Sequence, residues 1–445
     1  MKKILILGAG LSSSSLIKYL LDNSTEHNWK IKLGDVSFAT AKQKINNHPN
    51  GEALEFDIFN EFQKEKEIMN ADAVISMLPA RFHPLVAESC LKHKVHMLTA
   101  SYVSPEMKAM NEEAKKQGIA MLNELGVDPG IDHMSAMKVV DEIKEKGGKM
   151  IAFKSSTGGL IAPEYDNNPW NYKFTWNPRN VVVAGQGVSQ YIMNGNLKYL
   201  PYHQLFDRVE TTTVPGMGDF EVYPNRDSLK YRETYDLMDI PTMFRGTMRR
   251  PGYCKAWNVF VQLGMTDDTY VVENSENITY REFVNMFLAY DEKLSIEEKI
   301  MSKFNITMDS DIMYRLKWLG LFENIKVGLK DATPAQILQK ILVDKWILGE
   351  NDKDLIVMQH QFDYELSGKK HRKISSLVVI GEDNVHTAMS ITVGTPLAIA
   401  TKLLLTGAIN VTGVHTPVKK ELYAPILEEL EKYGIKFTEE EFEIN

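Results

Sequence analysis

The chain has 445 residues, of which 44% are hydrophobic and 25% are charged, and its formal net charge is −8 at pH 7. This length exceeds what one hydrophobic core supports and predicts two or three domains, while the negative charge argues against nucleic acid and anionic membrane surfaces as partners. The two cysteines, Cys90 and Cys254, give neither a disulfide framework nor the ligand spacing of a metal site, so we expect no metal and a cytoplasmic protein.

The N-terminal part of the chain alternates between short apolar runs and amphipathic segments. Strands are predicted at residues 3–7, 29–35, 54–57, 73–79, 95–100 and 119–122. Helices are predicted directly after the first strand and at residues 39–45, 84–93 and 106–117. Strands that alternate with helices predict an α/β fold with a parallel sheet and helices on both faces.

A glycine turn, Gly8-Ala9-Gly10, joins the first strand to the first helix. A strand, a glycine-rich turn and a helix in this order are typical of the Rossmann dinucleotide-binding unit, in which backbone N–H groups and the helix N-terminus bind a pyrophosphate. Ser13 occupies the third glycine position and is small enough for close packing of helix on strand. We therefore predict coenzyme contacts from Gly8, Gly10, Leu11 and Ser12.

The pattern changes after residue 126 and becomes richer in aromatic residues, asparagine and proline. A helix at 131–144 is followed by strand-like segments at 151–156, 180–184 and 218–223, helices at 295–304, 311–319 and 334–342, and strands at 355–366 and 373–380, joined by a polar hairpin loop. A long helical region at 384–407 and an acidic helix at 422–433 complete the chain. We predict a Rossmann domain at 1–130, an α+β substrate-binding and dimerisation domain at 131–390 with a helical insertion at about 290–345, and a C-terminal helical segment at 391–445.

Asp35 ends the second predicted strand. An acidic residue at this position accepts hydrogen bonds from the adenosine ribose hydroxyls, and its charge disfavours a 2′-phosphate. The alternative is an exposed strand-end carboxylate without a ligand. Lys42 on the following helix could serve a phosphate, so NAD and NADP both stay open, with NAD favoured.

Polar segments follow the fourth and fifth predicted strands, at Ser76–Pro79 and Ala100–Tyr102. Ligands of open α/β sheets lie outside the carboxyl ends of the strands, so both segments are expected near the nicotinamide ribose and the substrate. Ser76 could instead cap a loop, and Tyr102 could be a buried aromatic with a satisfied hydroxyl. The coenzyme contacts predicted here are Ser76, Leu78, Ala100 and Ser101.

Residues 124–133 form the densest cluster of titratable groups beside turn residues. Asp128 precedes a proline, which favours extended backbone, and a position at a strand end favours a substrate role. Asp132 could cap the first turn of the next helix, and a histidine such as His133 in that turn is more often structural than catalytic.

Several long and unusual segments carry a resemblance to a known family. They are residues 124–133, 158–164, 168–169, 172–179, 223–228, 244–249 and 393–396. Together they resemble the glutamate-forming saccharopine dehydrogenase (saccharopine reductase) family from end to end, although Thr157 stands where many relatives are expected to have a cysteine. The resemblance implies a Rossmann domain joined to a substrate domain, with the C-terminal segment packed back onto the Rossmann domain.

The resemblance also implies an activity and a set of site residues. The activity is NAD- or NADP-dependent interconversion of saccharopine with L-glutamate and 2-aminoadipate 6-semialdehyde, by hydride transfer at a C–N bond. The implied substrate contacts are Ser101, Tyr102, Asp128, Arg226, Thr247, Met248 and Arg249. Candidates for proton transfer are Tyr102, Asp128 and His133, and further coenzyme contacts are assigned to Gly126, Val127 and Asp128.

The side-chain chemistry of these residues agrees with the activity that the resemblance implies. Arg226 and Arg249 suit bidentate recognition of the carboxylates of saccharopine, and Asp128 suits an ammonium or iminium group. Without the motif context, Arg226 would be a surface charge and Arg249 part of a solvated turn.

Two other functions stay open. One is a reductase of the carboxynorspermidine synthase type, which acts on the imine of another semialdehyde and amine, and the other is a non-catalytic NAD(P)-binding sensor. We expect a small-molecule substrate and no nucleic acid. We expect no membrane span either, since no run was found to approach the roughly 18–20 apolar residues of such a span. A homodimer is expected from the resemblance, since substrate domains of such enzymes often pair through their sheets.

Overall fold

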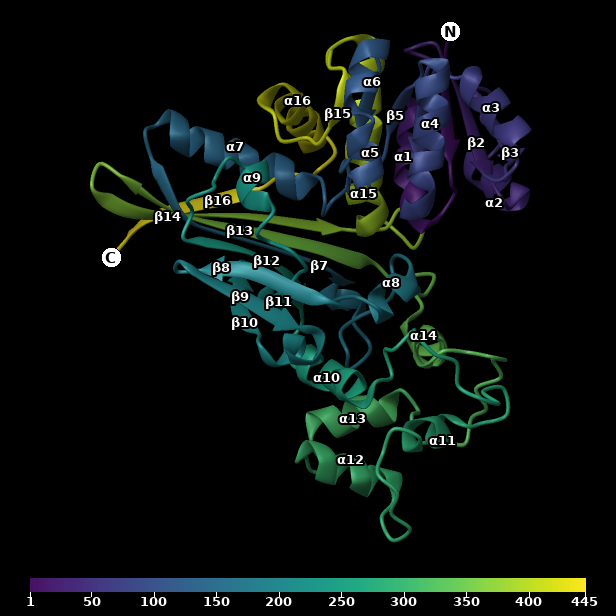
Figure 1. Ribbon diagram of the computed structural model, residues 1–445, viewed down its shortest axis with the longest axis vertical. Coiled ribbons are helices and arrows are strands. Elements are labelled where there is room, and N and C mark those ends of the chain that lie inside the picture. The colour runs from purple at the N-terminus through teal and green to yellow at the C-terminus, as the bar shows by residue number, and fades with distance from the viewer. The chain divides into compact units, whose positions relative to one another are not determined.

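The computed structural model describes residues 1–445, and the chain divides into two compact units (Figure 1). The first unit comprises Met1–Lys149 and Leu377–Thr438. The second comprises Met150–Ser376 and Glu439–Asn445. Each unit is built around one sheet.

The first unit contains a seven-stranded sheet in the order β15-β6-β5-β4-β1-β2-β3, and every pair of neighbouring strands is parallel. The strands are β1 (Lys2–Leu7), β2 (Trp29–Asp35), β3 (Gly51–Glu55), β4 (Ala73–Ser76), β5 (His96–Leu98), β6 (Ala120–Leu122) and β15 (Gly413–His415). The order of the first six strands is that of a doubly wound dinucleotide-binding fold, whose order reverses between β1 and β4. The predicted α/β fold class is therefore confirmed.

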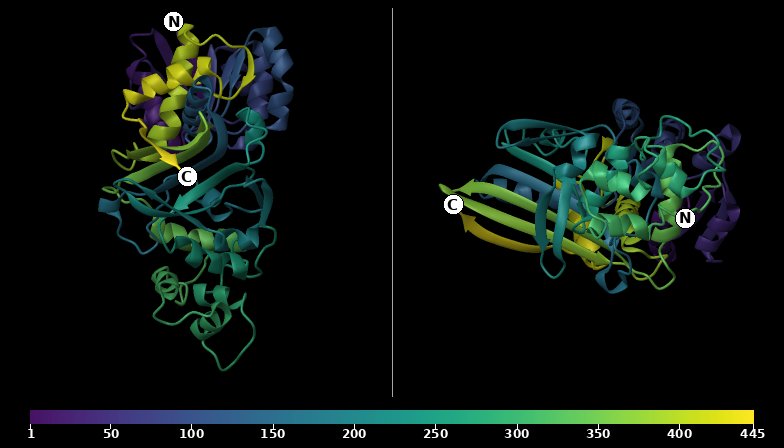
Figure 2. Two further views of the ribbon diagram at one scale, coloured as in Figure 1. Left: turned by 90° about the vertical axis from the view of Figure 1, so that its left-hand side faces the viewer. Right: turned by 90° about the horizontal axis from the view of Figure 1, so that it is seen from below.

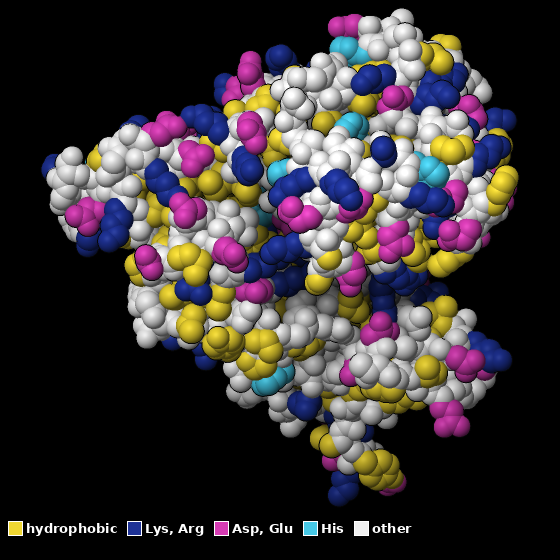
Figure 3. Space-filling model, turned by 45° about the horizontal axis from the view of Figure 1, so that its top comes forward, with side chains coloured by type: hydrophobic (Ala, Val, Ile, Leu, Met, Phe, Trp, Pro, Cys, Tyr) yellow, Lys and Arg dark blue, Asp and Glu magenta, His cyan; other side chains and the backbone are white.

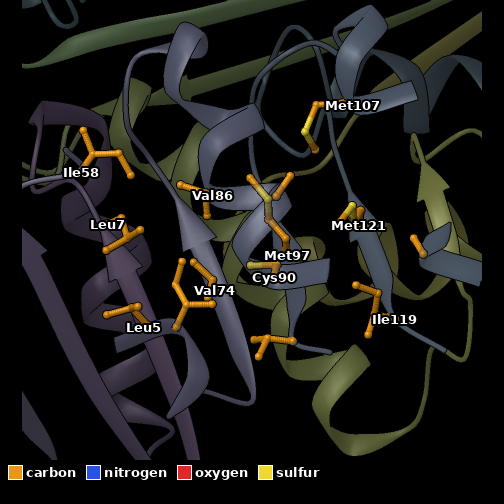
Figure 4. Close-up of a cluster of buried hydrophobic side chains, with 14 of the residues drawn as sticks. Leu5, Leu7, Ile58, Val74, Val86, Cys90, Met97, Met107, Ile119 and Met121 are labelled. Carbon is orange, nitrogen blue, oxygen red and sulfur yellow. The ribbon is translucent and has the colours of Figure 1, made fainter. Parts of the chain in front are cut away.

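Helices connect these strands. They are α1 (Ser14–Asp22), α2 (Phe38–Ile45), α3 (Glu61–Met69), α4 (His83–His93), α5 (Pro105–Ala109), α6 (Asn111–Gln117) and α7 (Ile131–Glu145). Figure 4 shows part of the core beneath them, where Leu5, Val74 and Met97 from neighbouring strands meet Val86 and Cys90 of α4. All five side chains are almost completely buried, and each stabilises the fold by about 1–3 kcal/mol through burial of apolar surface. This core holds the carboxyl ends of the strands in place.

Two C-terminal helices, α15 (Ala388–Thr406) and α16 (Lys420–Glu431), belong to the first unit. Helix α15 packs on α1, and the backbone N–H of Ser15 donates to Ser390 Oγ at 2.9 Å. Helix α16 packs on α7, and Tyr423 Oη donates to Asp141 Oδ2 at 2.7 Å. The helix that holds the glycine turn therefore has a C-terminal helix as its support.

By length and composition, α15 could cross a membrane: it has 19 residues and a mean hydropathy of 1.5 over an 18-residue window. This corrects the expectation that no apolar run reaches such a length. Of that window, 72% is buried inside the structure, and the contacts with α1 and α16 are those of a core helix. Apolar composition on all sides of a helix is expected for a helix buried in a protein core as well as for one in a membrane.

The second unit contains a nine-stranded mixed sheet with the path β10-β11-β12-β7-β13-β14-β16, and β8 pairs with β12 and β9. Its strands are β7 (Lys149–Ile161), β8 (Val188–Met193), β9 (Asn196–Pro201), β10 (Glu210–Val214), β11 (Gly218–Pro224), β12 (Thr242–Arg249), β13 (Asp354–Leu366), β14 (Lys369–Ile380) and β16 (Thr438–Ile444). Figure 2 shows β16 running beside the long hairpin of β13 and β14. The chain therefore ends as a strand of the second sheet.

Helices of the second unit gather mainly between β12 and β13. They are α10 (Tyr253–Leu263), α11 (Tyr280–Asn285), α12 (Ile296–Phe304), α13 (Asp311–Trp318) and α14 (Pro334–Trp346), preceded in the chain by α8 (Pro178–Val182) and α9 (Tyr231–Thr234). Three of them begin with a capping box, which satisfies the first N–H groups of each helix from its own sequence. The predicted helical insertion is therefore present, and its helices begin where capping residues in the sequence indicate.

Some predicted elements differ from the structure. Residues 180–184, predicted as strand-like from their valines, form no strand, and that prediction is wrong: residues 180–182 belong to helix α8 and residues 183–184 to the turn after it. Asn177 Oδ1 caps the helix by accepting from the Arg179 N–H at 3.0 Å, and Pro178 fits the first helical position. The loop between β13 and β14 shortens to Ser367 and Gly368, whose positive φ angles of 53° and 78° make a tight hairpin turn.

The unit boundaries differ from the predicted boundaries at residues 130 and 390. The first unit extends to Lys149 and begins again at Leu377. It includes α7 because α7 packs on α16. The C-terminal segment at 391–445, expected to be helical, contains most of α15, all of α16 and the strands β15 and β16.

Figure 3 shows that acidic and basic side chains are interspersed over the face that it displays. Charges of both signs lie among small hydrophobic patches. On this face the charge is mixed, unlike the continuous basic stripe that binds nucleic acid.

Candidate active site

The glycine turn closes tightly against the end of β4. Gly8 has a φ of +104°, and a Cβ at this position would lie 2.9 Å from the carbonyl oxygen of Met77. Its N–H donates to Gly34 O at 2.8 Å, which ties the turn to β2. Ser13 is fully buried, and its hydroxyl donates to Gly10 O at 2.8 Å. A small residue at each of these positions is therefore required by packing, as the motif predicts.

Asp35 lies beside this turn at the end of β2. Its Oδ2 accepts from the Ala9 N–H at 2.7 Å, and its Oδ1 accepts from the Ser37 N–H at 2.9 Å. The carboxylate therefore joins the glycine turn to the loop after β2. This position is the one expected of a ribose ligand, although both oxygens already accept a backbone N–H.

Lys44, which no sequence motif indicates, reaches the glycine turn from the last turn of α2. Its Nζ donates to Gly10 O at 2.9 Å and to Ser14 Oγ at 2.6 Å. Burial lowers the pKa of Lys44 to about 8, and the charge of Asp35 opposes part of that shift. Lys42, named earlier as a possible phosphate ligand, is exposed. Lys44 is thus the cation next to the predicted pyrophosphate site.

We expect coenzyme affinity to fall as the pH rises from 7 to 10. Protonated Lys44 attracts an anion, and with a pKa of about 8 it loses its charge within this range. Isothermal titration of the coenzyme at several pH values would measure the fall, with Lys44→Gln binding more weakly at pH 7 and showing a flatter profile. Lys42→Gln is the matched control, and an equal pH dependence in wild type and Lys44→Gln would contradict the role of Lys44.

His83 connects the ends of β4 and β5. Its Nδ1 lies 2.8 Å from Ser76 Oγ, and its Nε2 lies 2.7 Å from Ser101 Oγ. Both Ser76 and Ser101 were predicted as ligand contacts, and the structure brings them to one imidazole. Burial lowers the pKa of His83 to about 4, so the ring is neutral near pH 7.

Tyr102 and Asp128 also come together at this edge. The Tyr102 hydroxyl is 3.4 Å from Asp128 Oδ1, and both residues are partly exposed. Gly126 lies against the neighbouring strand end, since a Cβ on it would be 3.2 Å from Ala100 Cβ. The predicted contacts after β4, β5 and β6 are therefore close in space, and their roles toward a ligand stay predictions.

Glu124 and His133 form a buried pair. His133 is completely buried, and its Nε2 lies 2.7 Å from Glu124 Oε2. Glu124 has a positive φ of 59°, and its Oε1 accepts from the Val103 N–H at 3.0 Å. Asp132 Oδ1 accepts from the Gly130 N–H at 2.6 Å, in keeping with its expected place at the helix start. These contacts hold the segments that carry Tyr102 and Asp128, and a role of His133 in proton transfer stays a prediction.

The second unit holds Arg249 in a cage of tyrosines. Its guanidinium carbon lies 5.0, 5.8 and 5.3 Å from the ring centroids of Tyr172, Tyr223 and Tyr253. Nη1 donates to the Met248 carbonyl at 2.8 Å, whereas Nε is buried without a hydrogen-bond partner. A buried donor without a partner is costly, and a ligand carboxylate would satisfy it.

The strand register places further polar groups beside Arg249. Tyr223 pairs with Thr247 across β11 and β12, and Thr247 pairs with Thr157 across β12 and β7. Paired residues point to the same face of a sheet, as do residues two apart in a strand, so these three share a face with Arg249. Thr157 Oγ1 is a further buried polar atom without a partner. Met248 alternates to the opposite face, which leaves only its main chain for a ligand on this one.

Arg226 follows β11 in a strained conformation. Its φ is +49°, which is uncommon for a residue other than glycine, and its side chain is exposed. Its carbonyl accepts from the Gln190 N–H at 2.9 Å. Strained backbone is often found where a side chain must point at a ligand. Over the whole chain, the His, Cys, Asp and Glu side chains form no group of three that could hold a metal ion.

Comparisons with known proteins extend over the whole chain. Residues 4–122 match the saccharopine dehydrogenase NADP binding domain, and residues 126–435 match the saccharopine dehydrogenase C-terminal domain. The chain is 34% identical to the saccharopine dehydrogenase [NADP(+), L-glutamate-forming] of Schizosaccharomyces pombe, over 99% of both chains. The structure superposes on apo saccharopine dehydrogenase (L-Glu forming) from Saccharomyces cerevisiae with a TM-score of 0.89 and 31% identity, over 99% of this chain and 100% of that one.

A longer relative contains the chain as one part. The mitochondrial α-aminoadipic semialdehyde synthase of Rattus norvegicus is 36% identical over 98% of this chain. The match covers 47% of that synthase. The chain therefore spans about half the length of such relatives and the full length of the fungal dehydrogenases.

Proposed function

The chain belongs to the saccharopine dehydrogenase family, and from this membership we propose that it interconverts saccharopine with L-glutamate and 2-aminoadipate 6-semialdehyde. The observation that carries the proposal is the match to the S. pombe L-glutamate-forming enzyme over 99% of both chains. The caged Arg249, with a free buried Nε, supports it because saccharopine offers carboxylates that such a donor would bind.

The reaction needs few groups from the protein. In the oxidative direction, a hydride leaves the carbon and a proton leaves the nitrogen of the secondary amine, water adds to the imine, and the C–N bond breaks to release glutamate and the semialdehyde. The bound coenzyme accepts the hydride, while the protein supplies orientation and charge. In the second unit, Arg249 would hold a substrate carboxylate. In the first unit, Asp128 and Tyr102 are the candidates to assist the proton transfers.

We propose NADP as the coenzyme. The matching N-terminal domain is named for NADP binding, and the S. pombe dehydrogenase is named for NADP(+) as its coenzyme. The preference for NAD that was inferred from Asp35 has no support from these relatives. Two N–H groups donate to the Asp35 carboxylate, and Lys44 lies nearby. They offset part of the carboxylate's charge, which weakens its repulsion of a 2′-phosphate at this strand end.

Removal of the Asp35 charge is expected to change the coenzyme preference. In Asp35→Asn, we expect the ratio of kcat/KM for NADP to that for NAD to rise about 10-fold, because one like charge near the 2′-phosphate disappears. Steady-state kinetics with each coenzyme would measure the ratio. Asp22→Asn, at the exposed far end of α1, is the control. An unchanged ratio in Asp35→Asn would mean that Asp35 does not face the ribose.

The function itself is tested with purified protein, saccharopine and either coenzyme at alkaline pH. We expect reduced coenzyme to form with stoichiometric glutamate. Aspartate semialdehyde with diaminopropane is the competing pair, and turnover of this pair alone would favour a carboxynorspermidine-type reductase. Coenzyme binding without any amino-acid-dependent turnover would favour a sensor and overturn the proposal.

We further propose a cytoplasmic homodimer. Both cysteines are free and buried, which fits a reducing compartment. Strand β9 pairs only with β8, so its outer edge is open to pair with another strand. Sedimentation analysis of the purified protein would give the oligomeric state, and a monomer at micromolar concentration would contradict a stable dimer.

A further inference from the structure

A single buried histidine connects three hydroxyl groups at the edge of the first sheet. His83 begins α4 and is 3% exposed, and Ser76 and Thr99 around it are almost completely buried. Besides its contacts of 2.8 Å to Ser76 and 2.7 Å to Ser101, its Nε2 lies 3.4 Å from Thr99 Oγ1. Ser101 alone of these hydroxyl residues is partly exposed. The imidazole therefore lies behind the one hydroxyl that can meet a ligand.

The arrangement of protons in this cluster decides what Ser101 offers. A neutral imidazole has one N–H and one acceptor nitrogen. Nδ1 is the acceptor within reach of the buried Ser76 hydroxyl, and a buried hydroxyl without an acceptor would be costly. When Ser76 donates to Nδ1, the ring proton is on Nε2 and points at Ser101 Oγ. Ser101 then accepts from the ring, and its own hydrogen is free to be donated outward.

The opposite tautomer would reverse the role of Ser101. With the ring proton on Nδ1, Nε2 would take the Ser101 hydrogen, and Ser101 would present only lone pairs. Those lone pairs would repel a carboxylate or phosphate oxygen. Thr99 supports the arrangement from behind, because its Oγ1 accepts from the Ser101 N–H at 3.2 Å.

We propose that His83 is a positioning residue that, through the tautomer set by Ser76, presents the Ser101 hydroxyl as a hydrogen-bond donor to an acceptor oxygen of the bound ligand. This inference rests on the proposed function and on the predicted contact of Ser101 with the substrate or the coenzyme. The acceptor is a carboxylate of the amino-acid substrate or an oxygen of the coenzyme, and the kinetic constants for the two ligands distinguish these sources.

The test is a double-mutant cycle with Ser101→Ala and His83→Leu. We expect Ser101→Ala to raise one Michaelis constant, for saccharopine or for the coenzyme, by about 10-fold, the value of a hydrogen bond to a charged or strongly polar acceptor. His83→Leu should raise the same constant by a similar factor. The double variant should be no more than about 2-fold worse than either single variant, because residues that act through one contact are not additive.

Two more variants separate positioning from folding. His83→Gln keeps an N–H that can reach Ser101, so it should recover part of the loss, and it replaces His83→Leu in the cycle if that variant does not fold. His93→Gln, at the other end of α4 beside Glu65, is the control and should match wild type. Thermal unfolding of each variant shows whether the fold is kept.

Other outcomes of the double-mutant cycle would contradict the role of His83. Multiplicative effects in the double variant, a change in different constants for His83 and Ser101, or no effect of Ser101→Ala would each overturn the inference. None of these results touches the proposed function, which depends on saccharopine turnover by wild type and by His93→Gln.

Discussion

Replacement of Arg249 by methionine is expected to lower kcat/KM for saccharopine by about 100- to 1000-fold, while the affinity for the coenzyme is kept. The guanidinium is buried in its tyrosine cage with Nε free. A methionine fills a similar volume and removes the charge and the fork of donors that a substrate carboxylate would use. Steady-state kinetics and a separate coenzyme titration measure the two effects, with thermal unfolding as a check on the cage.

The neighbouring arginine provides a matched control. Arg250 lies over the ring of Phe220, and its Nη1 donates to the Met217 carbonyl at 2.6 Å. Phe220 alternates with Glu221, which pairs with Arg249, so the ring under Arg250 is on the face opposite to that of Arg249 and Thr247. Arg250→Met should stay within about 3-fold of wild type, as expected for a site away from the ligand. Equal losses in the two variants would assign Arg249 to structure alone, whereas Arg249→Lys tests how much depends on the planar fork.

In the first unit, the predicted strands and helices lie close to the observed ones, because the sequence signals for them are local. Strand β2 was predicted at the residues where it occurs, 29–35, and α2 and α4 within one residue of theirs. Apolar runs of a parallel sheet are continuous and are interrupted by glycine or proline. The strands of the second unit are longer, up to 13 residues in β7 and β13, yet β8, β9 and β10 were not anticipated. Strand β9, for example, exposes four of its six residues, so its sequence carries no continuous apolar run. In the case of α8, capping by Asn177 overrode the strand preference of its valines.

Some residues of the candidate site could likewise be predicted from the sequence, whereas others are visible only in the structure. Gly8, Asp35 and Asp128 could be proposed as site residues because turn and strand-end positions are visible in the sequence, and their roles toward a ligand stay predictions. Lys44 and the tyrosines around Arg249 could not, since packing between segments distant in the sequence brings them to their partners. His83 did leave a signal, as a histidine that opens a helix just after a strand with polar residues at its end. Its partner Ser101 follows a different strand, so the pair appears only in three dimensions.

The second large effect is expected at Gly394, inside α15. A Cβ on Gly394 would lie 2.6 Å from the backbone nitrogen of Leu16 and 3.1 Å from its Cβ. Leu16 is in the first turn of α1, where the helix N-terminus faces the predicted pyrophosphate. Only a residue without a side chain allows α15 to approach so closely, and Ser390, one turn earlier, accepts from the Ser15 N–H.

Gly394→Val should therefore weaken coenzyme binding by at least about 10-fold and lower the free energy of unfolding by about 1–3 kcal/mol, as overpacking does. Thermal unfolding and coenzyme titration would measure both effects. Thr406→Ala, at the exposed end of the same helix, should change neither. Normal coenzyme affinity in a destabilised Gly394→Val would show that α15 supports the fold but not the position of α1, whereas loss of both would make the C-terminal helix part of the coenzyme site.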